Sequence, residues 1–182
     1  MTPPVPTVNN TPAVDNGFPP DAKQLFDAIF KPDDPLEWRP MELWDDAAPA
    51  PALVRVNERN LAVVTTSGVV PWGNPDKFKT YRNTYWRKYN IAELKELEPG
   101  KWEAVHGGYN VAYMNQNPHY GVPLDALRAL EADGAIGAGK LYPAYYVIPG
   151  NQGSPAVMRR MGQEIAADLK NDGVEGVLLV AT

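Results

Sequence analysis

The residues best suited to chemistry lie in the stretch VHGGYN, residues 105–110. His106 can exchange a proton near neutral pH, and the two glycines beside it let the backbone approach a ligand closely. His106 and Asn110 are therefore candidates for a loop that contacts a ligand. A simpler alternative stays open, because the glycines can form a turn in which His106 hydrogen-bonds only locally.

A second candidate is PGNQGSP, residues 149–155, which precedes a long predicted helix. Free N–H groups and the helix dipole at such a terminus favour an anion such as a carboxylate or a phosphate. This position predicts Asn151 and Ser154 as substrate-binding residues. Ser154 can equally cap the helix, with Pro155 as its first residue, and that arrangement needs no ligand.

Residues 77–89 interleave basic and aromatic side chains without an acidic residue. Such segments can bind single-stranded nucleic acid through base stacking and phosphate contacts. The chain as a whole is acidic, however, with a net charge of −5, and no nucleic-acid-binding motif is evident. We therefore expect a loop that docks on an acidic partner or holds a carboxylate substrate, and no nucleic-acid partner.

Composition excludes several kinds of site. The 182 residues include no cysteine, which excludes disulfides, cysteine-ligated zinc, iron–sulfur clusters and a cysteine nucleophile within them. The two histidines are not adjacent, so a multi-histidine metal site is difficult to build and we predict no metal. No run approaches the ~20 apolar residues of a membrane span, and the N-terminus lacks signal-peptide features. We expect a soluble, cytoplasmic protein without a membrane partner.

The elements that must position these loops begin near residue 61, where short apolar runs start to alternate with helical patterns. Strands are predicted within residues 61–68, 101–109, 141–154 and 173–182, and helices at residues 91–97, about 123–134 and about 155–173. Residues 69–87 carry loop signals. This alternation indicates an α/β fold of the doubly wound kind, with a parallel sheet of about four strands and helices packed on it.

Ligands of such sheets bind at the carboxyl ends of the strands, where the loops leave. The site should therefore be formed by the loops at residues 65–68, 106–110 and 150–154. The last strand, residues 173–182, is the most apolar run and looks central, yet no crossover helix follows it. The predicted domain thus looks interrupted where this type of fold usually keeps its chemistry.

The N-terminal part differs in composition, because most of the 19 prolines lie within residues 1–51. We divide the chain into a disordered, proline-rich arm (1–20), a helix with an extended strap (21–56) and an α/β domain that is incomplete at its C-terminal end (57–182). Within the strap, Trp38 and Trp44 are typical of an interface or a cover over a core rather than of a ligand cage.

Several segments together resemble one known family. They are VVTTSGVVPWGNPD, WRKYNI, VHGGYN, NQNPHYGVPLDALRALEADGAIG and YYVIPGNQGSPAVMRRMGQEIAADLKNDGVEGVLLVAT. Their order and spacing resemble the selenoprotein B component of glycine, sarcosine and betaine reductases, with the D-proline reductase selenoprotein as a more distant relative. The resemblance runs from about Ala22 to Thr182.

This resemblance implies reductive cleavage of an α C–N bond in an amino acid or its N-methylated derivative. A pyruvoyl-containing partner subunit of component B would activate the amine substrate, a selenolate would attack the α-carbon, and the resulting selenoether would pass to the selenoprotein A component. No catalytic residue and no cofactor would then lie within these residues. His106, Asn110, Asn151 and Ser154 would be substrate-binding residues, through carboxylate binding or acid–base support. PGNQGSP replaces a GNGTS-like loop of the family, which leaves the choice of amine open.

In that family, the strand matching GVLLVAT is followed at once by a selenocysteine or a cysteine. Our hypothesis is that a UGA selenocysteine codon was read as a stop, so that the sequence is the upstream piece of a longer selenoprotein. An alternative to the UGA hypothesis is a split enzyme, in which a second subunit completes the site. An alternative to the reductase function is a noncatalytic scaffold or binding subunit. A sense codon, UAA or UAG at position 183 would contradict the UGA hypothesis.

Overall fold

A computed structural model describes residues 55–148 and 155–181. Its strands are β1 (Leu61–Thr65), β2 (Val69–Pro71), β3 (Arg87–Asn90), β4 (Trp102–Ala104), β5 (Leu141–Val147) and β6 (Gly176–Val180). Its helices are α2 (Val111–Gln116), α3 (Leu124–Ala132) and α4 (Pro155–Asn171), with short 3₁₀ turns η3 (Val56–Glu58) and η4 (Pro118–Tyr120). The predicted arm and almost all of the predicted helix and strap lie outside these residues.

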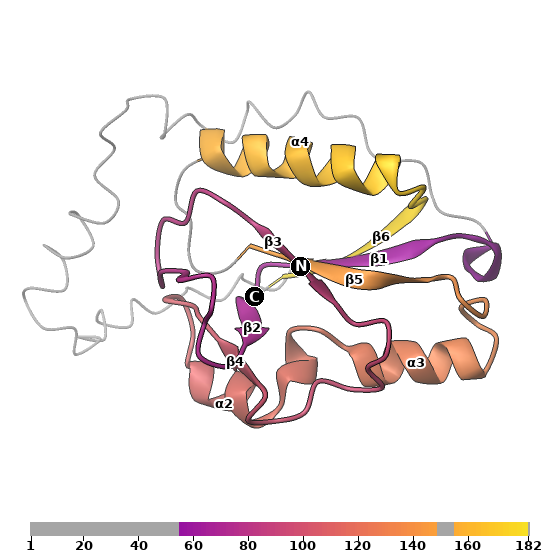
Figure 1. Ribbon diagram of the computed structural model, residues 1–182, viewed down its shortest axis with the longest axis horizontal. Helices are drawn as coiled ribbons and strands as arrows, with labels where there is room; N and C mark the ends of the chain where they lie inside the picture. Colours follow the sequence, from indigo (N-terminus) through magenta and orange to yellow (C-terminus); the bar gives the residue numbers. More distant parts are fainter. Residues whose placement is uncertain (1–54, 149–154, 182) are drawn as a thin grey trace, which may run out of the picture. The chain divides into compact units, whose positions relative to one another are not determined.

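The main sheet has four strands in the order β3-β5-β1-β6 (Figure 1). β1 lies at the centre and pairs in parallel with both β5 and β6. β3 pairs antiparallel with β5, so the sheet is mixed. The predicted α/β class and the number of strands are confirmed, and β3 is the member that was not predicted. β6 lies at an edge of this sheet and not at its centre.

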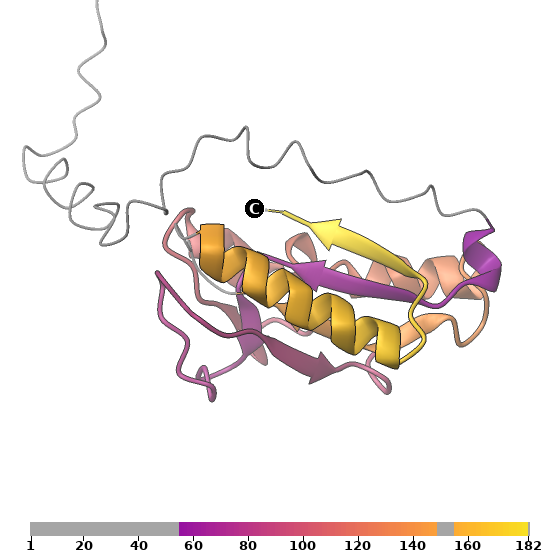
Figure 2. The same ribbon diagram turned by 90° about the horizontal axis from the view of Figure 1, so that it is seen from above.

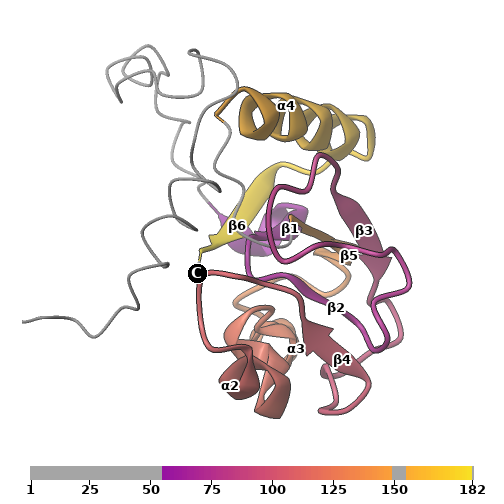
Figure 3. The ribbon, with the colours of Figure 1, turned by 90° about the vertical axis from the view of Figure 1, so that its left-hand side faces the viewer.

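Helices and a small ribbon cover the two faces of the main sheet (Figures 1 and 3). On one face, α4 buries Met161, Ile165 and Leu169, which are spaced by four residues and therefore share one side of the helix. The other face packs against α2, α3 and the antiparallel pair β2–β4. β1 contributes to both cores, because its residues alternate between the two faces.

Two of the expected elements differ from the structure. Residues 91–97 form turns instead of a helix. Arg128 explains this, since its guanidinium binds the carbonyl oxygens of Ile91, Ala92 and Leu94 at 2.8–3.1 Å. The strand expected at residues 101–109 is shorter than predicted, and it pairs with β2 instead of joining the main sheet.

In the part of the chain that the structure describes, no helix has both the length and the apolar character needed to cross a membrane. The longest helix, α4, has 17 residues and exposes polar side chains along much of its length.

Candidate functional site

The carboxyl ends of β1, β5 and β6 meet at one edge of the main sheet. The Thr66 N–H donates to the Val180 carbonyl at 3.0 Å, and the Ile148 N–H donates to the Thr65 carbonyl at 3.0 Å. Three parallel strands therefore end side by side. The sequence predicted that the site loops leave from such strand ends. In α/β sheets this is the edge at which ligands bind.

The turn after β1 is held rigid by two buried hydroxyl groups. Thr65 and Ser67 are both fully buried. The Thr65 hydroxyl donates to Ser67 Oγ at 2.8 Å and accepts from the Ser67 N–H at 3.0 Å. Ser67 Oγ also lies 3.4 Å from the Gly121 carbonyl oxygen. These hydroxyls are engaged inside the turn, so they shape the site instead of offering free donors.

The His106 loop is fastened to this turn. The Tyr109 hydroxyl donates to the Ser67 carbonyl at 2.5 Å, and the Val105 N–H donates to the Gly68 carbonyl at 2.9 Å. Burial raises the pKa of Tyr109 to about 12, so its hydroxyl keeps the proton that it donates. Two of the three predicted loops, residues 65–68 and 106–110, are therefore neighbours in the structure.

His106 presents one ring nitrogen that no other described group engages. Its Nδ1 accepts a hydrogen bond from the Gly108 N–H at 2.9 Å, and its ring packs on Tyr109 with 4.5 Å between ring centroids. Burial lowers the pKa of His106, which favours the neutral ring. With Nδ1 as the acceptor, the single proton lies on Nε2. The local hydrogen bond anticipated as the simpler alternative is present, and it leaves the Nε2–H available.

Tyr81 supports the loop at Gly107, the residue after His106. Its hydroxyl donates to the Gly107 carbonyl at 2.8 Å. A Cβ atom on Gly107 would lie 2.3 Å from the Tyr81 ring, so the close approach of ring and backbone requires glycine here. Neither Tyr81 nor Tyr109 was singled out from the sequence as a support of this loop.

The other predicted site residues fare differently. Asn110 is exposed, and its side-chain oxygen accepts from the Ala112 N–H at 3.1 Å as the cap of α2. This contact uses the oxygen, and no described group binds the amide nitrogen. Asn151 and Ser154 lie outside the described residues, between the end of β5 and the start of α4. All four substrate-binding assignments remain predictions.

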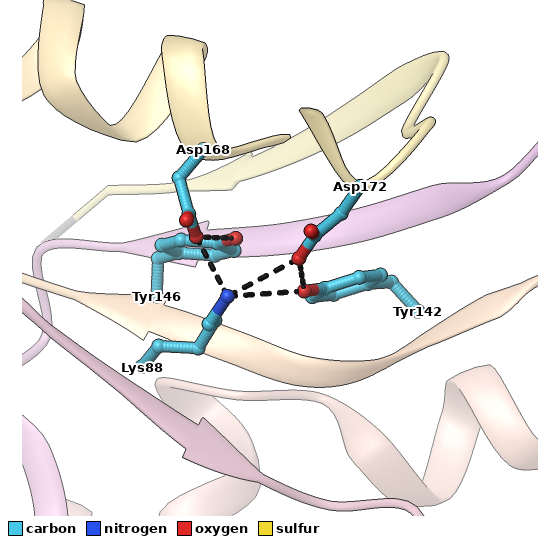
Figure 4. A network of polar contacts seen from close by, with 5 residues as sticks. All are labelled: Lys88, Tyr142, Tyr146, Asp168 and Asp172. Carbon is cyan, nitrogen blue, oxygen red and sulfur yellow. Dashed lines mark hydrogen bonds and ion pairs between the residues drawn. The ribbon is translucent and has the colours of Figure 1, made fainter. Parts of the chain in front are cut away.

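A second polar cluster joins α4 and the residue after it to β3 and β5 (Figure 4). Lys88 Nζ lies 2.7 Å from Asp168 Oδ2, 3.2 Å from Asp172 Oδ2 and 3.2 Å from the Tyr142 hydroxyl. The Tyr146 hydroxyl donates to Asp168 at 2.6 Å, and the Tyr142 hydroxyl donates to Asp172. The cluster fastens the C-terminal half of α4 to the sheet.

This cluster changes the interpretation of the basic segment 77–89. Hydrogen bonding to Asp168 raises the pKa of Lys88, and hydrogen bonding to Lys88 lowers the pKa of Asp168. Arg87 pairs in turn with Asp76 at 2.6 Å. Two of the basic side chains expected to meet an acidic partner or a carboxylate substrate are therefore neutralised within the chain.

Replacing Asp168 by asparagine should lower the free energy of unfolding by about 1 kcal/mol at pH 7, since the pair with Lys88 is one-third exposed and screened by solvent. The folded state depresses the pKa of Asp168. Its contribution is therefore complete above the unfolded pKa of about 3.9 and is lost as the pH falls through the lower folded value. Urea unfolding at several pH values measures this difference.

The matched control is Asp133→Asn, which makes the same change at an exposed position at the end of α3. It should change the free energy of unfolding by less than about 0.5 kcal/mol. A deficit in Asp168→Asn that stays constant down to pH 2 would contradict the proposed role of the carboxylate.

Metal ligation finds no support in residues 55–148 and 155–181. Nowhere in these ranges do three histidine, aspartate or glutamate side chains lie close enough together to hold an ion. The two carboxylates of the Lys88 cluster are occupied by Lys88 and two tyrosine hydroxyls.

Comparison with known proteins places the chain in a family. The model of the family described as "Glycine/sarcosine/betaine reductase selenoprotein B (GRDB)" matches residues 34–182. The chain belongs to this family. The matching stretch includes β1, the His106 loop, α4 and β6, and thus every described part of the candidate site. The resemblance seen in the sequence is confirmed.

Curated relatives of this selenoprotein B family member are component B subunits of amino-acid reductase complexes. One is the "Glycine reductase complex component B subunit gamma" of Carboxydothermus hydrogenoformans, 42% identical over 79% of this chain and 32% of its own. The "Betaine reductase complex component B subunit beta" of Peptoclostridium acidaminophilum is 39% identical over 70% of this chain and 29% of its own. The "Sarcosine reductase complex component B subunit beta" of the same organism is 32% identical over 79% of this chain and 32% of its own.

The chain thus spans about a third of the length of these relatives. No solved structure shows a significant match to it.

Proposed function

We propose that this chain forms part of component B of a glycine-, sarcosine- or betaine-type reductase and builds the scaffold beside its reactive atom. One observation carries this proposal. Three parallel strands end side by side, and the loop fastened to the turn after β1 presents a neutral His106. Family membership supports the same assignment. In this proposal the protein works in the cytoplasm, together with a pyruvoyl-containing subunit and the selenoprotein A component.

The reactive groups come from outside the described residues. A selenocysteine selenolate supplies a soft anionic nucleophile for the substrate α-carbon, and a pyruvoyl group makes the nitrogen of a primary or secondary amine a better leaving group. The edge where β1, β5 and β6 end fits such a neighbour, because three strand ends and the His106 loop meet there.

Within this arrangement His106 binds the substrate. The Nε2–H of the neutral ring donates a hydrogen bond to one carboxylate oxygen, and a bond to a charged acceptor is stronger than one between neutral groups. Asn110 offers its amide N–H groups at the rim of the same loop. The bond between the buried hydroxyls of Thr65 and Ser67 fixes the turn after β1, and the Ser67 carbonyl in turn holds the loop through Tyr109.

A noncatalytic scaffold subunit is the second candidate, and one observation favours it. Tyr113 and Tyr120 expose 65% and 66% of their surface, beside the 106–110 loop in sequence, as side chains at an interface with another subunit would. In this alternative, neither His106 nor the strand ends would contact the substrate.

Expression of the complete reading frame with its partner subunits tests the proposal. We expect selenium to be incorporated, and release of ammonia from glycine, methylamine from sarcosine or trimethylamine from betaine, since each is the product of C–N cleavage. The three substrates assayed separately identify the amine. A purified complex that contains this chain but neither selenium nor a cysteine thiol at the site, and that releases no amine, would favour the scaffold alternative.

A further inference from the structure

The two edges of the main sheet are protected to different degrees. Exposed sheet edges usually carry charges, prolines or bulges that prevent pairing with another strand. β3 follows this rule, since it begins with Arg87 and Lys88. β6 does not, because it reads GVLLV and contains neither a charged residue nor a proline. Its sequence is that of a strand with neighbours on both sides.

Among the described residues, one side of the β6 backbone has no pairing strand. The Gly176 N–H donates to the Asn60 carbonyl and the Val180 carbonyl accepts from Thr66, so these residues direct their backbone groups toward β1 and its flanks. Along a strand these directions alternate, and Val177 and Leu179 therefore direct their N–H and C=O groups away from β1. Within the described ranges, β6 pairs with β1 alone.

One face of β6 is uncovered as well. Val177 and Leu179 lie beside Ala62 and Val64 of β1, on the face that packs against α4. Ala62 is fully buried under that layer, whereas Val177 is 42% and Leu179 is 74% exposed. Figure 2, viewed from the side of α4, shows β6 beside the helix and not beneath it. The apolar layer that α4 forms on this face therefore covers β1 but does not extend to β6.

We propose that the free edge of β6 receives a β-strand, and its face an apolar segment, from the part of the selenoprotein B fold that this chain does not span. This inference rests on the proposed membership in component B. The chain corresponds to 32% of the Carboxydothermus hydrogenoformans subunit, which leaves ample polypeptide for both elements. A strand added in parallel ends next to Val180 and Thr66, and so delivers the residues that follow it to the His106 loop.

Two forms of the protein test this docking. In one, the chain is co-expressed with the part of the Carboxydothermus subunit that lies outside its matching segment. In the other, the same part is joined to residue 182 as one continuous chain, which does not require it to fold alone. Amide hydrogen exchange of both forms is compared with that of the 182-residue chain. We expect the Val177 and Leu179 amides to exchange at least tenfold more slowly in both forms, and the Gly176 and Leu178 amides to change less.

Side-chain variants test the covered face. Leu179→Lys should leave the isolated chain folded, because this side chain is largely exposed, and should weaken association with the co-expressed part at least tenfold. Leu130→Lys is the matched control, since Leu130 is 42% exposed on α3 at the opposite face of the sheet. This control should leave association unchanged.

Three results would overturn the docking. The first is rapid exchange of the Val177 and Leu179 amides in the joined chain. The second is association that survives Leu179→Lys. The third is a dimer of the 182-residue chain that protects these two amides and that the co-expressed part does not displace. Each is independent of amine release, so a failed reductase assay and a failed docking remain distinguishable.

Discussion

Replacing His106 by alanine should lower kcat/KM for amine release by about 10²-fold, the lower end of what a positioned hydrogen-bonding or acid–base group contributes. The fold should remain intact, since His106 is half-buried and its recorded contacts are with Gly108 and Tyr109. Amine release by the assembled component B, measured beside thermal unfolding of the variant, tests both statements.

Two conservative variants separate the ring nitrogens of His106. In His106→Asn the side-chain oxygen can replace Nδ1 and accept from Gly108, but no donor reaches the position of Nε2. His106→Gln can place an amide N–H close to that position. We expect asparagine to be as inactive as alanine and glutamine to recover about tenfold. Equal activity of the asparagine variant and the wild type would remove His106 from the site.

The pH dependence of His106 has a defined sign. Burial lowers the pKa of the folded ring below its ordinary value of about 6.5, so the ring is neutral at pH 7 and binds a proton only as the pH falls through the lowered value. Protonation places a hydrogen on Nδ1 and breaks the bond from the Gly108 N–H. Activity should therefore decline on the acidic side of pH 6.5 in the wild type, and this limb should be absent in His106→Gln.

Substituting Gly107 by alanine should have the largest effect on the stability of the site. The new Cβ would lie 2.3 Å from the Tyr81 ring, and the ring is also fixed by the bond from its hydroxyl to the Gly107 carbonyl. We expect a loss of about 1–3 kcal/mol in the free energy of unfolding, which is usual for overpacking. Urea unfolding measures it.

The double variant identifies the cause of this loss. Tyr81→Ala removes the ring that the new Cβ would contact, so adding Gly107→Ala to it should cost less than in the wild type. Gly162→Ala is a matched control on α4, where an added Cβ meets nothing within 4 Å and where alanine favours the helix. Additive losses for Gly107→Ala and Tyr81→Ala would contradict a direct contact.

The sequence predicted the elements that depend on local patterns and missed those that are held by distant residues. β1, β5, α3 and α4 were recognisable because their apolar periods repeat within each segment. β3 was not, since its residues RKYN show no apolar alternation and it is held by β5 and by the acids of α4. The helix expected at residues 91–97 failed for a similar reason, because a distant arginine binds its carbonyl groups.

The candidate site shows the same division. The loops at strand ends could be located from the order of elements, and His106 from its type. The supporting tyrosines could not, since Tyr81 and Tyr109 act through contacts 26 and 42 residues away in the chain. A weak signal existed for the Lys88 cluster, because Asp168 lies in the last turn of α4 and Asp172 is the residue that follows the helix, four positions later.

The central place of β1 also governs the order in which the protein can assemble during synthesis. β1 is made first, yet its partners begin 80 and 115 residues later, as the pairs Leu61–Leu141 and Leu61–Gly176 show. At about 5–20 residues per second, roughly 6–23 s pass before β6 follows β1 out of the ribosome. During that interval the apolar strand β1 has neither of its partners, so this segment of the nascent chain is open to mispairing and aggregation, and faster synthesis shortens that exposure.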